Sequence, residues 1–168
     1  LISGPCHLET PLEFTGSIQR ISVESAKEMF SAVMSNLDVD AFFSVAAVAD
    51  WGIKNFQSQK IKKTNSGNPE LEFELNPDIL AQVAAHAEKN KHPYCIGFAA
   101  ETEELEKYAA EKRARKNVPL LVGNIGPTTF GQDENELLLI EATGSSRLPK
   151  ADKLTLARQL IAHISTKI

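Results

Sequence analysis

The nearly apolar run from Ala41 to Ala49 is the feature that most constrains how this chain can fold. A helix that crosses a membrane needs about 20 apolar residues, so this run is too short to span a bilayer. A continuous apolar segment bounded by polar residues is typical of a β-strand buried on both faces, as in a parallel sheet covered by helices. We therefore expect residues 41–48 to form a buried central strand.

Strand-like and helix-like segments alternate along the rest of the chain. Strands are expected at the very start of the chain and at residues 41–48, 70–75, 94–99, 120–122 and 137–140. Apolar residues recur with the helical period in the other segments, which predicts helices at residues 24–36, from Asn76 onward, and at 103–116 and 151–164. This alternation indicates an α/β protein with a Rossmann-like, doubly wound and mainly parallel sheet, helices on both faces, and ligands at the carboxyl ends of the strands.

Length and composition favour one folded domain that spans residues 1–168. Hydrophobic residues make up 42% of the 168 residues, which is enough for a core without disulfides or structural metal. The 18 Lys and Arg residues against 22 Asp and Glu residues give a net charge of −4, which disfavours a disordered tail or a general nucleic-acid binder. Cys6 and Cys95 lack the paired spacing of a zinc site or disulfide framework, and no leader opens the chain, so a cytoplasmic location is expected. Because the chain begins at Leu1 rather than Met, we expect a piece of a longer protein.

The loops that leave the strand ends are the candidate ligand contacts in such a fold. They are Ser44 to Asp50, Ala99 to Glu101 and Val122 to Gly126. Asp50 closes the most apolar strand, and a charged residue at that place either caps a helix or contacts a ligand. The following Trp51-Gly52 is more typical of a turn than of a helix, so both interpretations stay open.

A polar stretch follows from Asp50 to about Asn68, and we expect a mobile loop or flap there. It contains the lysine cluster Lys60-Ile61-Lys62-Lys63. Such a cluster in a loop is usually a solvated charge run. The alternative is that one lysine folds over an anionic ligand, because an ammonium on a flexible stem suits a phosphate.

The helix expected at residues 103–116 places two lysines on its inward face. With 100° per residue, Lys112 and Lys116 continue the stripe that begins at Leu105, while Arg113 and Arg115 flank it. Cations in a last helical turn also interact favourably with the helix dipole, and lysines snorkel. Two inward lysines four residues apart are nevertheless what a polyphosphate site would need.

The segment Asn76-Pro77-Asp78-Ile79-Leu80 has the signature of a helix start, with Asn as N-cap, Pro at the first helical position and a carboxylate in the first turn. A well-capped helix is sufficient to explain these residues. Alternatively, the exposed backbone N–H groups bind a ligand. The charge of Asp78 would repel phosphates, so a sugar or base is the expected neighbour.

Several catalytic patterns are missing from the sequence. No Gly-x-Gly-x-x-Gly follows a strand, no P-loop is present, and the four His residues lack metal-ligand spacing or a nucleophile beside them. Hydride transfer by a Rossmann dehydrogenase and hydrolysis by a catalytic triad both lose support.

Taken together, these motifs resemble phosphopantothenoylcysteine synthetase, usually the C-terminal half of the bifunctional flavoprotein of coenzyme A biosynthesis. The resemblance covers nearly the whole chain, in order, through Ala46–Asp50, Lys60–Lys63, Asn76–Leu80, Gly97–Thr102, Lys112–Asn117 and Phe130–Asn135. It implies a ligase that joins 4′-phosphopantothenate to L-cysteine with CTP and Mg²⁺, through an acyl-cytidylate and with release of pyrophosphate and CMP.

The resemblance also implies site residues. It places CTP against the backbone at Ser44, Val45 and Ala46, with Asp50 also on the nucleotide, and it makes Lys60 the residue that promotes formation of the acyl-cytidylate. The remaining nucleotide contacts that it implies are Pro77, Asp78, Ile79, Leu80 and Phe98, with Lys112 and Lys116 on the phosphates. No residue is assigned to a metal.

The resemblance implies a homodimer that is normally fused to a flavin-dependent decarboxylase. That half is not in this sequence, so FMN is not expected to bind. The upstream part of the ligase domain, with its Gly-Gly-Thr turn, its Asn and its Ser-Ser-Gly-Lys-Met stretch, is not in this sequence either. A non-catalytic nucleotide-binding or regulatory module is therefore the alternative function, and tight binding of NAD(P) would instead indicate an oxidoreductase.

Overall fold

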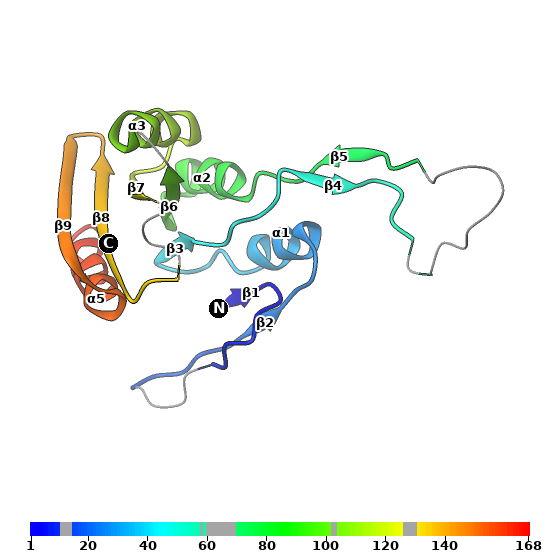
Figure 1. Cartoon of the computed structure of the whole chain (residues 1–168), viewed down its shortest axis with the longest axis horizontal. Helices are drawn as coiled ribbons and strands as arrows, with labels where there is room; N and C mark the ends of the chain where they lie inside the picture. The colour runs from blue at the N-terminus through cyan, green and yellow to red at the C-terminus, as the bar shows by residue number, and fades with distance from the viewer. Residues whose placement is uncertain (11–14, 58, 60–69, 102–103, 126–130) are drawn as a thin grey trace. The chain divides into compact units, whose positions relative to one another are not determined.

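The computed structural model of the chain describes residues 1–10, 15–57, 59, 70–101, 104–125 and 131–168 (Figure 1). The chain divides into two compact units. The first unit contains Leu1–Ser35 and Ala46–Asp78, and the second contains Asn36–Val45 and Ile79–Ile168.

A five-stranded sheet forms the second unit, in the order β3-β6-β7-β8-β9. Its strands are β3 (Ala41–Ser44), β6 (Tyr94–Glu101), β7 (Leu120–Ile125), β8 (Glu134–Glu141) and β9 (Gly144–Asp152). The first three strands run parallel, whereas β7–β8 and β8–β9 are antiparallel. The expectation of a mainly parallel sheet is therefore wrong, because the sheet is mixed.

Connection lengths explain the mixed sheet. A parallel crossover needs a dozen or more residues, but only residues 126–133 join β7 to β8 and only residues 142–143 join β8 to β9. Strand β9 was not predicted from the sequence, because its residues are mostly exposed and polar along the sheet edge and show no apolar alternation.

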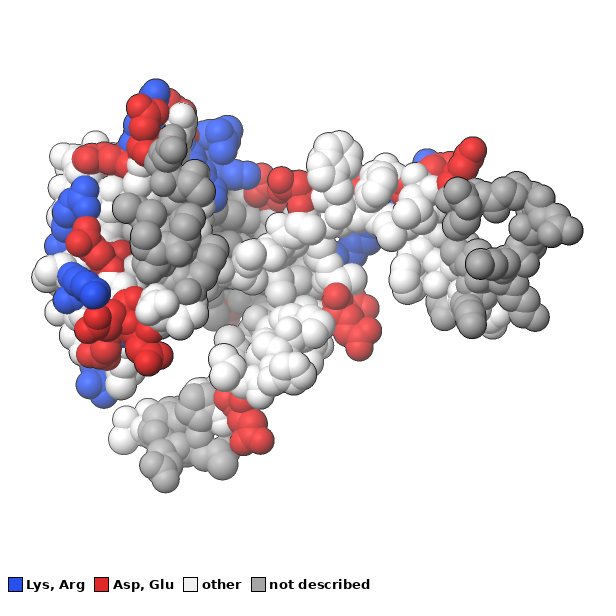
Figure 2. All heavy atoms as spheres, in the orientation of Figure 1, with Lys and Arg blue, Asp and Glu red and all other residues white. Residues whose placement is uncertain are grey.

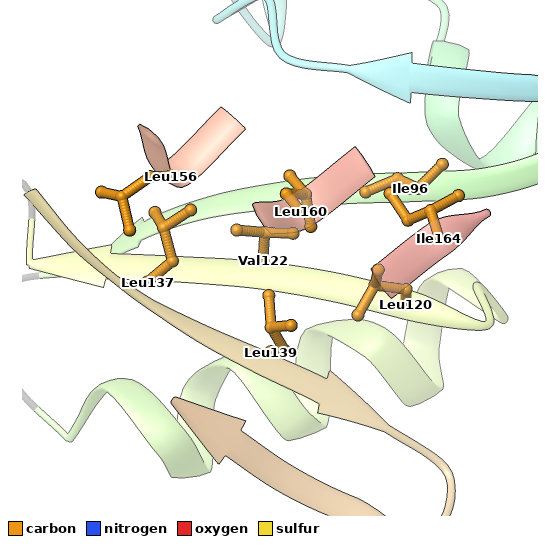
Figure 3. Packing of buried hydrophobic residues seen from close by; sticks show 8 residues of the cluster. All are labelled: Ile96, Leu120, Val122, Leu137, Leu139, Leu156, Leu160 and Ile164. Carbon is orange, nitrogen blue, oxygen red and sulfur yellow. The ribbon is translucent and has the colours of Figure 1, made fainter. Parts of the chain in front are cut away.

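Helices cover both faces of this sheet, as expected. On one face, α5 (Lys153–Ile164) packs Leu156, Leu160 and Ile164 against the sheet (Figure 3). The sheet contributes five side chains to the same cluster, namely Ile96, Leu120, Val122, Leu137 and Leu139. Burying each such side chain contributes roughly 1.5–3 kcal/mol, so this cluster is a major source of the stability of the second unit.

On the opposite face, α2 (Ile79–Asn90) and α3 (Leu105–Lys116) approach two glycines of the central strands. A Cβ atom on Gly97 would lie 2.8 Å from Leu80 of α2, and one on Gly123 would lie 3.0 Å from Leu105 of α3. The glycines therefore let both helices sit closer to the sheet than any other residue would allow.

The first unit is built from short elements. Strands β1 (Ile2–Ser3) and β2 (Ile21–Ser22) pair in parallel, and α1 (Ala26–Met34) follows them. Helix α1 begins with a capping box, in which Ser25 accepts a hydrogen bond from the Glu28 N–H and the Glu28 carboxylate accepts one from the Ser25 N–H. This cap explains why the helix begins at Ala26 rather than at Glu24.

An antiparallel ribbon completes the first unit, formed by β4 (Trp51–Ile53) and β5 (Phe73–Leu75). Strand β4 lies where the sequence predicted only an irregular flap. The strand escaped prediction because three residues are too few to show a period. Of the other residues of the expected flap, residues 58 and 60–68 lie outside the described residues.

Two further expectations about element bounds are wrong. The prediction was a strand through Val48 buried on both faces, but β3 ends at Ser44 and is only half-buried. It is half-buried because, among the described strands, it pairs with β6 alone. Helix α2 begins at Ile79 instead of Pro77. Asp78, and not Asn76, directly precedes this first helical residue, and the side-chain amide of Asn76 donates to the carbonyl of Ala49 at 2.9 Å.

No helix in the part of the chain that the structure describes is long and apolar enough to cross a membrane.

The carboxylate of Glu141 ties the end of β8 to the end of the chain. One of its oxygens lies 3.0 Å from Nζ of Lys167, and the other lies 3.4 Å from Nε2 of His163. Partial desolvation raises the pKa of Glu141, but the Lys167 ammonium and His163 outweigh it and hold this pKa below its ordinary value. A carboxyl with a lowered folded-state pKa stabilises the fold above its unfolded pKa and loses that contribution as the pH falls.

We predict that Glu141→Gln lowers the free energy of unfolding by about 1 kcal/mol at pH 7, as expected for loss of one charged hydrogen bond. The difference from the wild type should shrink as the pH falls below 4.5, the ordinary value for the carboxyl. Urea unfolding followed by circular dichroism between pH 7 and 3.5 measures it. Glu136→Gln is the control, because Glu136 pairs with Arg147 at 2.6 Å in an exposed position and should change stability by less than about 0.5 kcal/mol. Equal effects of the two substitutions at pH 7 would contradict the role of Glu141.

Candidate functional site

The expected site residues are shared between the two units, because the chain passes from one unit to the other after Val45 and again after Asp78. The second unit carries Ser44, Val45, Ile79, Leu80, Phe98, Lys112 and Lys116, and the first carries Ala46, Asp50, Pro77 and Asp78. Lys60 lies outside the described residues.

In the second unit, the carboxyl end of β3 lies beside the middle of β6. Ser44, the last residue of β3, is paired with Gly97 of β6, and Phe98 follows directly. Both Ser44 and Phe98 are half-buried. The sheet therefore brings these two expected nucleotide contacts together at the edge where β3 ends, while β6 continues to Glu101. Doubly wound sheets bind ligands at the carboxyl ends of their strands.

Lys112 of α3 reaches the same edge. Its Nζ donates a hydrogen bond to the backbone carbonyl of Phe98 at 3.1 Å. Lys112 and Lys116 are half-buried, whereas Lys107 and Arg115 on the same helix are exposed, which agrees with the orientation expected from the helical period. The structure therefore holds an ammonium group beside the middle of β6, at the level where β3 ends.

Arg113, which the sequence placed beside the lysine stripe, has a structural role. Its guanidinium donates to the carbonyl of Val118 at 3.0 Å, just past the end of α3. Asn117 between them adopts a left-handed conformation with φ of 50°, as is common for the residue that ends a helix.

Ile79 and Leu80 present backbone rather than side chains to any ligand. Both side chains are buried, and Leu80 lies against Gly97. The first N–H groups of a helix have no partner within the helix, so the start of α2 can donate backbone hydrogen bonds to a polar ligand. An isolated glycine in a strand indicates that another segment packs closely against the strand backbone, as Leu80 does against Gly97. The sequence alone therefore contained a signal for this contact.

In the first unit, Asp50 and Pro77 are held close together at the base of the ribbon. The backbone N–H of Asn76 donates to the carbonyl of Asp50 at 2.8 Å, and the Asn76 side chain donates to the carbonyl of Ala49. The Asp50 side chain is exposed and Pro77 is half-buried. The role of Asn76 was missed because its place before Pro suggested a helix cap.

The two cysteines have different surroundings. Cys95 is buried, which raises its pKa to about 11, so it stays a neutral thiol near pH 7. Cys6 is exposed, and its pKa is lowered by hydrogen bonds to Ser3 and the Leu8 backbone, with a further contribution from Arg20. Within the described ranges, no group of three or more His, Cys, Asp or Glu residues could hold a metal ion.

A surface pocket of about 470 Å³ lies in the second unit, away from the expected contacts. It is lined by residues 38–40, which precede β3, by Lys91, His92 and Tyr94 at the start of β6, and by the last two residues of the chain. It is therefore at the amino ends of the strands and shares no residue with the candidate site.

The whole chain is similar to a known protein family. Residues 1–168 match the model of the family described as "DNA/pantothenate metabolism flavoprotein C-terminal domain". The chain is 38% identical to the coenzyme A biosynthesis bifunctional protein CoaBC of Vibrio vulnificus and 39% identical to that of Escherichia coli K12. Each alignment covers 99% of this chain but only 41% of the bifunctional protein, so the chain spans about two fifths of these relatives.

A solved structure is similar over the same region. The crystal structure of the C-terminal domain of the coenzyme A biosynthesis bifunctional protein CoaBC superposes with a TM-score of 0.76 at 30% sequence identity. The match covers 99% of this chain and 72% of that domain.

Proposed function

Because the chain belongs to the family of the DNA/pantothenate metabolism flavoprotein C-terminal domain, the phosphopantothenoylcysteine synthetase half of CoaBC, we propose that it joins 4′-phosphopantothenate to L-cysteine at the expense of CTP. Homology to the ligase half of the coenzyme A biosynthesis protein CoaBC supports this proposal. The observation that best supports it in the molecule is the hydrogen bond from Lys112 to the carbonyl of Phe98, which holds a cation beside β6 at the level where β3 ends.

The described residues suit a nucleoside triphosphate. Ser44, Val45 and Ala46 follow the end of β3 and offer backbone groups, and the start of α2 offers further N–H donors. Lys112 and Lys116 lie one helical turn apart and are both half-buried, so their ammonium groups can meet successive phosphates of one chain. Asp50 and Asp78 are exposed and suit the sugar or base rather than the phosphates.

The proposed reaction has two steps. A carboxylate oxygen of 4′-phosphopantothenate attacks the α-phosphorus of CTP, the bond to the β-phosphate oxygen breaks, and pyrophosphate leaves. The cysteine amine then attacks the carbonyl carbon of the acyl-cytidylate, loses a proton and expels CMP, which forms the amide. Little covalent chemistry falls to the protein, so its task is to position the reactants and to oppose the charge on the phosphates.

Lys60 is the proposed catalytic residue of the first step, on the basis of the family resemblance. Its ammonium would stabilise the negative charge that develops on the α-phosphate and on pyrophosphate as the bond breaks. Mg²⁺, which binds through phosphates with only one or two protein carboxylates, would enter with CTP and share this charge.

We predict that the chain releases pyrophosphate when it is given CTP, 4′-phosphopantothenate and Mg²⁺, and that Lys60→Ala slows this release about 100-fold with a smaller effect on CTP affinity. Lys54→Ala is the matched control, because Lys54 is an exposed lysine of the same segment that pairs with Glu72. A coupled pyrophosphate assay and calorimetric titration with CTP measure the two effects.

CTP binding by the wild-type chain without pyrophosphate release would instead support the non-catalytic module. A raised KM for CTP at unchanged rate in Lys60→Ala would contradict the role of Lys60.

We also predict that Lys112→Ala weakens CTP binding about 10-fold, because it removes one charged contact to the phosphates. Lys107→Ala on the same helix is the control, since Lys107 is exposed and pairs with Glu104 at 3.3 Å. Calorimetric titration with CTP at two salt concentrations measures both variants. Wild-type affinity in Lys112→Ala would mean that this lysine serves only to support the backbone of β6 at Phe98.

We further propose that the protein is a homodimer and that the ribbon provides its interface. Cross-strand partners in an antiparallel pair share a face, so Trp51, Ile53, Phe73 and Leu75 form one apolar ribbon face. All four are exposed, Trp51 by 59% and Phe73 by 61%, and the surface around β4 and β5 is largely uncharged in Figure 2. On the other face, Glu74 forms an ion pair with Lys27 of α1. An apolar face of this kind is self-complementary and would be buried against a second copy.

Phe73→Lys should therefore convert the dimer to a monomer, because it puts one charge of each copy into the apolar interface. Leu154→Lys is the control, since Leu154 is equally exposed, by 61%, but lies on α5. Analytical ultracentrifugation at micromolar concentration separates the two states. A wild-type monomer would refute the dimer, and a Phe73→Lys variant that stays dimeric would refute the ribbon as its interface.

A further inference from the structure

The base of the ribbon contains a side chain to which neither the sequence nor the family resemblance assigned a role in the site. Asn76 makes two hydrogen bonds to the segment that directly precedes β4. Its backbone N–H donates to the carbonyl of Asp50 at 2.8 Å, and its side-chain Nδ2 donates to the carbonyl of Ala49 at 2.9 Å. Two bonds to successive carbonyls fix the direction of a chain as well as its distance, which a single bond would not do.

Gly52 makes room for this side chain. A Cβ atom at position 52 would lie 2.7 Å from Oδ1 of Asn76 and 3.4 Å from its Cγ, closer than side-chain carbons ordinarily approach. The amide is thus packed against the backbone of Gly52 on one side while it donates to Ala49 on the other. Asn76 and Gly52 together form what we call the ribbon clamp.

The ribbon clamp lies where the two nucleotide-contacting stretches of the first unit meet. Asp50 precedes β4 directly, and Pro77 follows Asn76 directly in the chain. Asp50 and Pro77 are far apart in the chain, so their covalent connection does not by itself fix their separation. The ladder of β4 and β5 and the ribbon clamp at its base supply that restraint.

From this geometry we propose that Asn76 is a positioning residue for the nucleotide, which holds the backbone at Asp50 and at Pro77 in the mutual placement that CTP requires. The inference rests on the proposed function for the identity of the ligand. The side-chain amide is essential to the role, because an Asp at this position would turn a carboxylate oxygen toward the carbonyl of Ala49, and two acceptors repel.

The chain contains a built-in reporter for the clamp. Trp51 is the only tryptophan in the sequence, follows Asp50, and pairs across the ribbon with Leu75. A change at the base of the ribbon should therefore alter the emission maximum or the anisotropy of Trp51 without any ligand. This readout separates the existence of the clamp from its consequence for CTP.

The experiment compares Asn76→Asp, Asn76→Ala, Gly52→Ala and the double variant Gly52→Ala with Asn76→Ala. We expect the Kd for CTP to rise about 5-fold in Asn76→Ala and more in Asn76→Asp, with altered Trp51 fluorescence in each. Gly52→Ala should have a similar effect by displacing the amide, and it should add little once the amide is gone, because the two substitutions break one interaction.

Asn90→Asp is the matched control. The Asn90 side chain also donates to a backbone carbonyl at 2.9 Å, that of His86, but at the far end of α2 from Ile79 and Leu80. It should leave Trp51 emission and CTP affinity unchanged. The helical circular dichroism signal of every variant shows whether it is folded.

Each outcome decides one part of the inference. Altered Trp51 fluorescence with wild-type CTP affinity would refute the positioning role, and unaltered fluorescence or fully additive effects of Gly52→Ala and Asn76→Ala would refute the clamp. A wild-type chain that does not bind CTP would refute the proposed function and the nucleotide role of Asn76 together, while the Trp51 measurements would still show whether the clamp exists.

Discussion

The structure of the second unit depends on burying the two central strands, β6 and β7, on both faces. On one face the side chains of Ile96, Leu120 and Val122 pack against α5. On the other, Gly97 and Gly123 have no side chain at all, so α2 and α3 come close to the backbone of the strands. This close approach places the start of α2 and the inner side of α3 beside the strands whose ends carry the candidate site.

The same constraint decides which groups are available for chemistry. Ile79 and Leu80 are committed to the core, so the start of α2 offers only its backbone. Lys112 starts from a helix packed against the sheet and reaches the carbonyl of Phe98, so its ammonium is directed by packing rather than by a flexible loop. The proposed site therefore combines backbone donors, which suit the sugar and base, with anchored cations, which suit phosphates.

Individual residues show how far the sequence could predict the fold and the site. The helical period correctly located α1, α3, α5 and, apart from its start, α2, and the half-burial of Lys112 and Lys116 follows from the same period. Strands β4 and β9 escaped prediction because one is too short to show a period and the other is a polar edge strand. Asn76 was misassigned as a cap because the identity of a residue before Pro does not reveal whether its amide turns toward the helix or toward a distant carbonyl.

The sequence by itself determined the class of fold, the positions of the helices and the family, because these follow from local periodicity and from the order of short motifs. The tertiary structure alone decided the direction of β8 and β9 in the sheet, the partner of the Asn76 amide and the partner of the Lys112 ammonium. These are pairings between residues far apart in the chain or between groups with several possible partners. Local pattern is silent about such pairings, because their free energy depends on which segments are brought together when the core is buried.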